Sequence, residues 1–186
     1  MTISDDESES VLLERIHARD PVAFRQVYEQ HRVPLYRFCY MALSGDDAAE
    51  DAVHETFLKL WHNPPVCESL RGLKAWLYRV ARNEVAMLRR RQKWVVRADT
   101  DAIAHEETPL SMLAAAETAS LLRRGLASIR PEYRDVLLLR EFGELSYAEI
   151  AQVTGSTISA VKSEIFRARR ALADVMKPMI TERNSP

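Results

Sequence analysis

The sequence predicts an all-α protein made of two small helical domains joined by an acidic linker, the C-terminal domain containing a helix-turn-helix. Apolar residues recur at steps of three and four through most of the chain, and no segment alternates with the period of two that is typical of a strand. At 186 residues the chain has room for two small domains. Residues 98–109 carry acids without sustained periodicity. We therefore expect domains at residues 1–97 and 113–186 and a linker at 98–112.

Three helices are predicted in the N-terminal domain. The first begins at Pro21, and Pro34 is expected to kink it or to remove a hydrogen bond within it. The second follows the break at residues 44–46 and must end before Pro64. The third covers about residues 70–93. Packed together, these helices provide an adequate core for one domain.

The C-terminal domain ends in the pattern of a helix-turn-helix. Ser146 and Glu149 have the spacing of a capping box at a helix start, and Gly155 stands where a helix ends in a left-handed residue. A second helix begins near Thr157, with an apolar stripe of Ile158, Val161, Ile165, Ala168 and Leu172. Six residues project away from that stripe: Ser159, Lys162, Ser163, Phe166, Arg167 and Arg170. These residue types suit a helix in the major groove of DNA, although a hairpin in an unrelated bundle fits the segment too.

Basic charge is concentrated in one block of a chain whose net charge is only −1. Residues 71–97 hold nine basic residues and one acid, Glu84, whereas residues 1–62 hold six basic residues and twelve acids. The block is a candidate for phosphate contact, and a solvated basic helix face is the alternative.

Several classes of protein find no support in the sequence. No apolar run approaches the roughly 20 residues that span a bilayer, and residues 1–10 are acidic, so we expect a cytoplasmic protein. Cys39 and Cys67 form no CxxC pair and are expected to be reduced thiols. No phosphate loop, HExxH motif or pair of catalytic carboxylates is visible, so we expect no enzyme, no cofactor and no small-molecule substrate. His54 and His62 lie two turns apart without a third ligand nearby, so no metal site is expected.

Four stretches, in this order, resemble the extracytoplasmic-function (ECF) sigma factors of the sigma-70 family. They are residues 20–28 (DPVAFRQVY), 49–61 (AEDAVHETFLKLW), 75–83 (AWLYRVARN) and the DNA-binding end at 147–151 (YAEIA), 161–163 (VKS) and 167–172 (RARRAL). The resemblance covers residues 20–177. It implies a non-enzymatic subunit that binds core RNA polymerase, recognises and melts promoter DNA and starts transcription. It also implies control by an anti-sigma factor, which is typically membrane-linked.

The resemblance assigns a surface to each stretch. Core polymerase would be bound by Asp51, His54, Glu55, Leu58 and His62, where His54 replaces the Gln that is usual in the family. The promoter melting element would be met by Trp76, Tyr78, Arg79, Arg82, Asn83 and Arg90, while ordinary core packing is the alternative for Trp76. The loop before this helix, residues 62–69, would capture an extruded base. The upstream promoter element would be read by the six outward residues of the helix-turn-helix.

Two positions depart from the family pattern. Glu164 stands where an Arg is common, and its carboxylate would repel phosphate or accept from a cytosine amino group. Met87 stands where many relatives have Asp. The rival class of function is a stand-alone helix-turn-helix repressor, which would usually dimerise and bind duplex DNA without polymerase. The chain shows no obvious dimerisation heptad.

Overall fold

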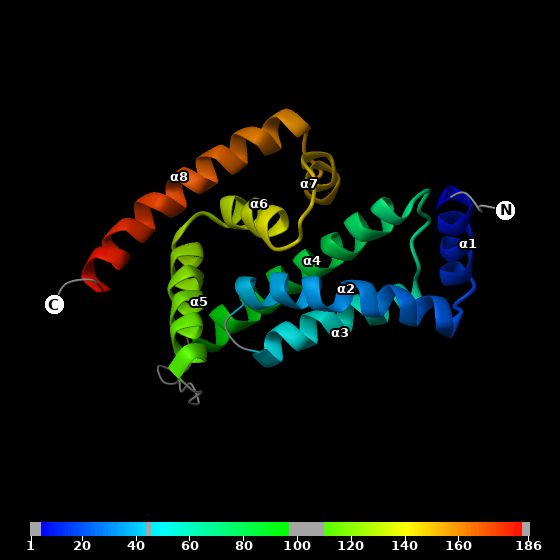
Figure 1. Ribbon diagram of the computed structural model, residues 1–186, viewed down its shortest axis with the longest axis horizontal. Coiled ribbons are helices and arrows are strands. Elements are labelled where there is room, and N and C mark those ends of the chain that lie inside the picture. The colour runs from blue at the N-terminus through cyan, green and yellow to red at the C-terminus, as the bar shows by residue number, and fades with distance from the viewer. Residues whose placement is uncertain (1–4, 44–45, 97–109, 184–186) are drawn as a thin grey trace.

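The computed structural model describes residues 5–43, 46–96 and 110–183, and the regular structure in these ranges is entirely helical (Figure 1). The helices are α1 (Asp5–His17), α2 (Pro21–Ala42), α3 (Asp46–His62), α4 (Leu70–Val96), α5 (Leu110–Ser128), α6 (Pro131–Glu141), α7 (Tyr147–Thr154) and α8 (Ile158–Arg183). The predicted all-α class is confirmed. Residues 98–109 of the expected linker lie outside the described residues, and residues 110–112 already belong to α5. Within the described ranges, no helix has the length and apolarity that crossing a membrane requires.

Helices α2, α3 and α4 form the N-terminal bundle, in which each contacts the other two. The Asp20 carboxylate caps α2 by accepting from the Val22 amide at 2.8 Å, and Pro21 occupies the first helical position, where its missing N–H costs nothing. α2 then continues through Pro34 as one helix. The Lys59 ammonium binds the Glu84 carboxylate and so joins α3 to α4. This pairing explains how Glu84 can be only 3% exposed.

Helix α1 was missed by the sequence prediction. It packs on α2 through the buried side chains of Leu12 and Ile16. The Glu9 carboxylate accepts from the Leu70 amide at 3.4 Å, so α1 also reaches the first turn of α4. An apolar stripe this short, in an acidic segment, gives little periodic signal.

Helices α5 to α8 form the C-terminal domain, in which α8 packs along α5, α6 and α7. The guanidinium of Arg134 donates to the carbonyl oxygens of Leu126 at 2.7 Å and Ala127 at 3.0 Å. These carbonyls lie in the last turn of α5, where no further helical amide is available. Arg134 therefore fixes the turn between α5 and α6.

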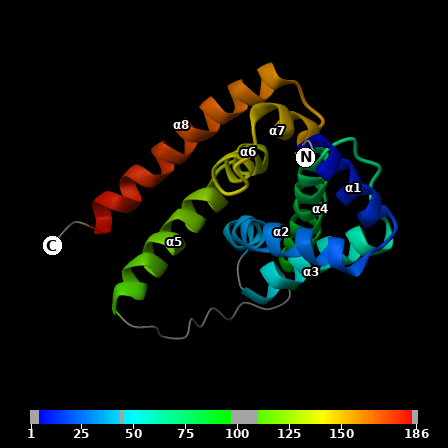
Figure 2. The same ribbon diagram turned by 45° about the vertical axis from the view of Figure 1, so that its right-hand side comes forward.

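The two domains share one hydrophobic core. α7 packs on α4, while α5 and α6 pack on α2, so the C-terminal domain lies directly against the N-terminal bundle (Figure 2). Phe38 and Tyr78 of the N-terminal bundle belong to the same buried cluster as Leu138, Leu139 and Leu145 of the C-terminal domain. We call this contact region, between α2 and α4 on one side and α5, α6, α7 and the turn at residues 142–146 on the other, the interdomain seam.

Candidate nucleic-acid interface

The helix-turn-helix is built by local hydrogen bonds that the sequence pattern anticipates. The Ser146 hydroxyl accepts from the Glu149 amide at 3.2 Å, and the Glu149 carboxylate accepts from the Ser146 amide at 2.7 Å. This is the predicted capping box. Gly155 ends α7 with φ 68°, in the left-handed region that glycine enters without strain. The Thr157 hydroxyl then accepts from the Ala160 amide at 3.1 Å and starts α8.

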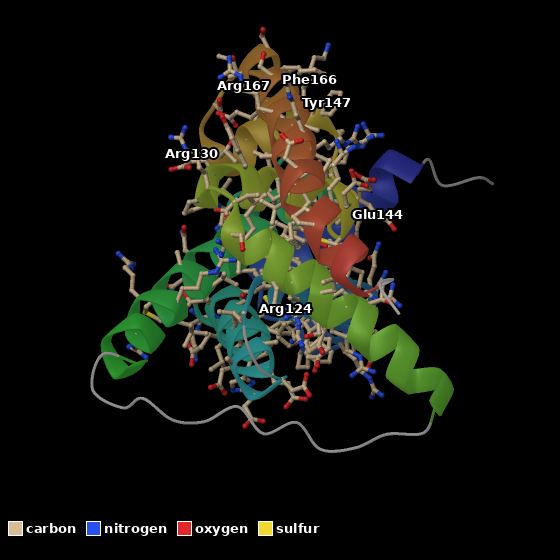
Figure 3. All side chains as sticks on the ribbon, turned by 90° about the vertical axis from the view of Figure 1, so that its left-hand side faces the viewer. Arg124, Arg130, Glu144, Tyr147, Phe166 and Arg167 are labelled. Carbon is tan, nitrogen blue, oxygen red and sulfur yellow. The ribbon has the colours of Figure 1, made fainter. Side chains whose placement is uncertain are left out.

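Helix α8 presents the predicted outward residues to solvent. Val161, Ile165 and Ala168 are buried against α6 and α7, which fixes the rotation of the helix. All six residues of what we call the α8 face are exposed: Ser159, Lys162, Ser163, Phe166, Arg167 and Arg170. Phe166 is 70% exposed, and Figure 3 shows it beside Arg167 at the free end of the domain. A phenyl ring left in water at this place suits contact with a thymine methyl group.

The flanks of the α8 face differ from its centre. The sequence predicts Ile158 in the apolar stripe, but its side chain is 47% exposed, because it is the first residue of α8. Arg169 is exposed, yet its guanidinium donates to the Glu141 carboxylate at 2.8 Å. The departing residue Glu164 is half-buried on the flank next to Ala168, away from Phe166 and Arg170. Its carboxylate therefore lies at the margin of the face.

The predicted surface on α4 is divided between solvent and the interdomain seam. Asn83 and Arg90 are exposed, and Trp76 is half-buried against the core. Arg79 donates to the Gln152 carbonyl oxygen of α7 at 2.5 Å. Arg82 donates through Nε to the Asp135 carboxylate of α6 at 2.6 Å. Hence two of the predicted arginines contact the C-terminal domain of the same chain.

Tyr78 lies on the opposite side of α4 from Trp76 and is 0% exposed. Its ring meets Phe38 edge to face, with 5.5 Å between the ring centroids, and Gly143 packs so closely that a Cβ added there would lie 2.9 Å from Tyr78 Cε1. Burial raises the pKa of Tyr78 above its ordinary value. In this arrangement of the domains α4 therefore turns the Tyr78 side chain into the seam and not to solvent, and its contact with the promoter melting element stays a prediction.

Arg89 is a residue that the sequence reasoning did not single out. Its Nε donates to the Ala42 carbonyl oxygen at 2.9 Å, and its Nη1 lies 3.5 Å from the second oxygen of Asp135. Burial, together with the nearby charge of Arg134, lowers the pKa of Arg89 to about 10. Two arginines of the basic block thus converge on one carboxylate. The density of arginines in the block was visible in the sequence, but their common partner was not.

The predicted polymerase-binding residues share one side of α3. We call Asp51, His54, Glu55, Leu58 and His62 the α3 face; the four polar residues are exposed and Leu58 is half-buried. Ala52, Val53, Thr56 and Leu60 are buried on the other side of the helix. The Thr56 hydroxyl donates to the Ala52 carbonyl oxygen at 2.7 Å, which removes its need for an outside partner. The core contacts of α3 therefore come from the side opposite the α3 face.

Other candidate chemistry is sparse in the described part of the chain. No cluster of three or more potential His, Cys, Asp or Glu ligands is found there. Cys39 is buried and Cys67 is half-buried, and neither takes part in a disulfide in the described part of the chain. Burial raises the pKa of the Cys39 thiol to about 12, so this cysteine is an inert core residue. Met87 is half-buried on α4.

Two family models match the chain. The model described as Sigma-70 region 2 matches residues 27–95, which include most of α2, all of α3 and nearly all of α4. The model described as Sigma-70, region 4 matches residues 119–172, which include α6, α7 and more than half of α8. The two matches fall on the N-terminal bundle and on the C-terminal domain respectively.

Curated relatives and solved structures agree with these matches. The chain is 34% identical over 160 residues to the ECF RNA polymerase sigma factor SigL of Mycobacterium tuberculosis, covering 83% of this chain and 89% of the relative. It is 32% identical over 199 residues to the ECF RNA polymerase sigma-E factor of Escherichia coli K12, covering 96% and 99%. The sigma factor RpoE in complex with the anti-sigma factor NepR, from Bartonella quintana, is similar in structure with a TM-score of 0.64 at 25% identity, covering 83% and 96%. CnrH, in complex with the cytosolic domain of CnrY, has the same fold with a TM-score of 0.71 at 22% identity, covering 95% and 99%. From these matches and the two helical domains that carry them, the chain belongs to the extracytoplasmic-function sigma factors of the sigma-70 family.

Proposed function

We propose that this sigma factor binds core RNA polymerase through the α3 face, meets the promoter melting element through α4 and reads the upstream promoter element through the α8 face. The domain boundaries proposed for this division of labour are residues 1–97 and 113–186, with 98–112 between them. No catalytic step is required of the chain, because polymerase carries the chemistry. The protein would act in the cytoplasm, where polymerase and the chromosome are located.

The observation that carries the proposal is the α8 face. A capped helix-turn-helix holds α8 so that serine, lysine, phenylalanine and arginine side chains all project from the free side. Arg167 and Arg170 have the reach and donor geometry to contact guanine or phosphate, and Phe166 adds an apolar contact for a thymine methyl group. These groups have the size and chemistry that the major groove admits.

Helix α4 supplies the complementary chemistry for separated strands. Trp76, Asn83 and Arg90 share one side of the helix at steps of seven residues, and an aromatic ring beside basic side chains is the usual platform for single-stranded DNA. Extruding a base costs a few kcal/mol of stacking, which stacking on protein and phosphate contact can offset. Arg79 and Arg82 would join this surface once their present partners release them.

Two classes of protein partner follow from the same surfaces. The exposed carboxylates of Asp51 and Glu55 beside Leu58 suit a partner with basic and apolar groups, as proposed for core polymerase. The similar structure of the sigma factor RpoE in complex with the anti-sigma factor NepR supports a partner of that kind for this chain as well. We propose an anti-sigma factor, membrane-linked, that covers the polymerase-binding surfaces.

Run-off transcription tests the proposal directly. Bacterial core polymerase is assayed on a library of promoter fragments with and without the protein. We expect selective initiation only when the protein is added, and the selected fragments identify both promoter elements. Absence of initiation, together with tight duplex binding by the protein alone, would instead support the stand-alone repressor.

The α3 face has its own test. Asp51→Lys with Glu55→Lys reverses two exposed charges and should weaken binding to core polymerase by at least about tenfold, because like charges then oppose each other across the interface. Helicity should not change. The matched control is Glu29→Lys with Glu50→Lys, which makes the same charge change at exposed positions outside the α3 face. Equal loss in both variants, measured by fluorescence anisotropy of the labelled protein, would show a general charge effect and remove the α3 face from the proposal.

A further inference from the structure

The basic helix α4 is held by the C-terminal domain of its own chain. We propose that this domain is an intramolecular cover for one flank of α4, in which Asp135 takes the place of DNA phosphate, and that the cover must open before α4 can engage promoter DNA in full. The inference rests on the proposed function of α4 and adds a regulatory step to it. In this reading the free protein is closed before any inhibitor binds.

Asp135 is the centre of the contact. One of its carboxylate oxygens accepts from Arg82 Nε at 2.6 Å, and the other lies 3.5 Å from Arg89 Nη1. The Asp135 side chain is only 14% exposed, so both charge pairs are largely shielded from salt. A carboxylate and a phosphate offer an arginine the same kind of acceptor. The arginines held by Asp135 are therefore unavailable to a DNA backbone while the seam is closed.

Further contacts extend the cover along α4. Arg79 donates to the Gln152 carbonyl oxygen at 2.5 Å, and the Lys74 ammonium lies 3.4 Å from the Glu144 carbonyl oxygen. The Tyr78 side chain, which lies on α4 between Lys74 and Arg79, is buried, and Gly143 packs closely against its ring. Positions 74, 78, 82 and 89 follow at steps of four, four and seven, which places them along one side of a helix. The exposed side with Asn83 and Arg90 is left open, so the cover blocks one flank and not the whole surface.

Closing the seam also has an unfavourable contribution to its free energy, from buried polar atoms. Tyr78 Oη and Arg89 Nη2 are buried without a hydrogen-bond partner in the described part of the protein. Burying such groups unpaired is unfavourable, and both would regain hydrogen bonds if the domains separated. The ion pairs and apolar packing hold the seam closed, while these two atoms favour opening. Because favourable and unfavourable contributions oppose each other, the seam is a contact that polymerase with promoter DNA can open by binding the open form more tightly.

Asp135→Ala tests the cover in the full-length chain. Removing the carboxylate should raise the open fraction, and with it the affinity for short random-sequence single-stranded DNA, by about tenfold, since apparent affinity scales with the fraction of competent molecules. The matched control is Glu132→Ala on the same helix, which removes an exposed acid whose near partner is Arg130 of the same domain. Opening is measured as the distance between fluorophores on E29C and D174C, in a background with Cys67→Ser. Helicity is compared by circular dichroism.

A charge exchange separates the contact from any general effect of charge on DNA binding. Arg82→Asp and Asp135→Arg should each open the seam in the distance measurement. The double variant should be more closed than either single variant, but not fully closed, because Arg89 also loses its acidic partner. Behaviour of Asp135→Ala that matches Glu132→Ala, or a double variant no more closed than the singles, would overturn the inference. Run-off transcription keeps the two proposals apart. Transcription without an effect of Asp135→Ala defeats the cover alone, whereas opening through Asp135 without any transcription defeats the proposed function alone.

Discussion

Helices α4 and α8 carry the two basic surfaces of this sigma factor, and the structure treats them differently. The α8 face is in solvent, with Phe166 70% exposed beside Arg167 and Arg170. On α4, Arg79 and Arg82 bind the C-terminal domain and Tyr78 is buried. A helix whose basic side chains are already paired has less to offer DNA than one whose side chains are free, even when the two sequences look equally basic.

The difference follows from how each helix is fixed. α8 is anchored by the buried side chains of Val161, Ile165 and Ala168 on one side, which leaves the α8 face on the other side exposed to solvent. α4 lies between two partners, since α3 packs on one side and α7 on another. Whether the basic side chains of a helix stay free thus depends on how many neighbouring helices pack on it, and not on its amino-acid composition.

The largest expected effect is a difference in DNA affinity between arginine-to-alanine variants of α8 and of α4. Arg167→Ala with Arg170→Ala should weaken binding of a duplex selected by run-off transcription by about 100-fold and lower the salt slope by about two, one for each lost phosphate contact. Arg82→Ala in the same assay should change affinity less than about threefold, because Asp135 already occupies that guanidinium. Anisotropy titrations across a range of salt concentrations measure both quantities. Arg169→Ala is the control on α8, since this guanidinium is paired with Glu141. Similar losses from the α4 and α8 variants would mean that α4 is not covered in the free protein.

Packing at the interdomain seam gives the next prediction. A Cβ at Gly143 would lie 2.7 Å from the Leu139 carbonyl oxygen and 2.9 Å from Tyr78 Cε1, and neither a backbone oxygen nor an enclosed ring can move away easily. Gly143→Ala should therefore lower the free energy of unfolding by about 2 kcal/mol, as measured by urea denaturation. Gly72→Ala is the matched control in α4, where the nearest atoms lie at 3.6 Å. There alanine should be neutral or stabilise by about 0.5 kcal/mol through helix propensity. Equal stability of the two variants would contradict a tightly packed seam.

Local structure was predictable from the sequence to the extent that its causes are local. The capping box of Ser146 and Glu149, the left-handed Gly155 and the outward side chains of α8 all depend on residues within one or two turns, and each is present as predicted. The sequence predicts Ile158 in the buried stripe because the three- and four-residue spacing continues to the first residue of the helix, where about half of the side chain is left in solvent.

The interdomain seam could not be predicted in the same way. Arg82 and Asp135 are 53 positions apart, and neither has a neighbour in sequence that indicates the other. Tyr78 lies in a basic stretch that the sequence predicts to face the promoter, yet its ring is buried between Phe38 of its own domain and Gly143 of the other domain. Such contacts depend on how two helical units meet, and helical periodicity within each unit carries no information about that.

The smallest expected effect concerns the Tyr78 hydroxyl, which is buried and has no hydrogen-bond partner among the described residues. Tyr78→Phe keeps the ring against Phe38 and removes only the oxygen that burial leaves unsatisfied, so the free energy of unfolding should rise by about 1 kcal/mol. Tyr133→Phe, which alters a half-buried tyrosine of α6, should change stability by less than about 0.5 kcal/mol. If α4 instead used the Tyr78 hydroxyl in a predominantly open protein, Tyr78→Phe would leave stability unchanged and weaken binding of single-stranded DNA. If Tyr78→Phe is more stable and its domains separate no more often than those of the unsubstituted protein, the Tyr78 side chain lies in the seam. It then belongs to the covered flank of α4, which α8 does not have.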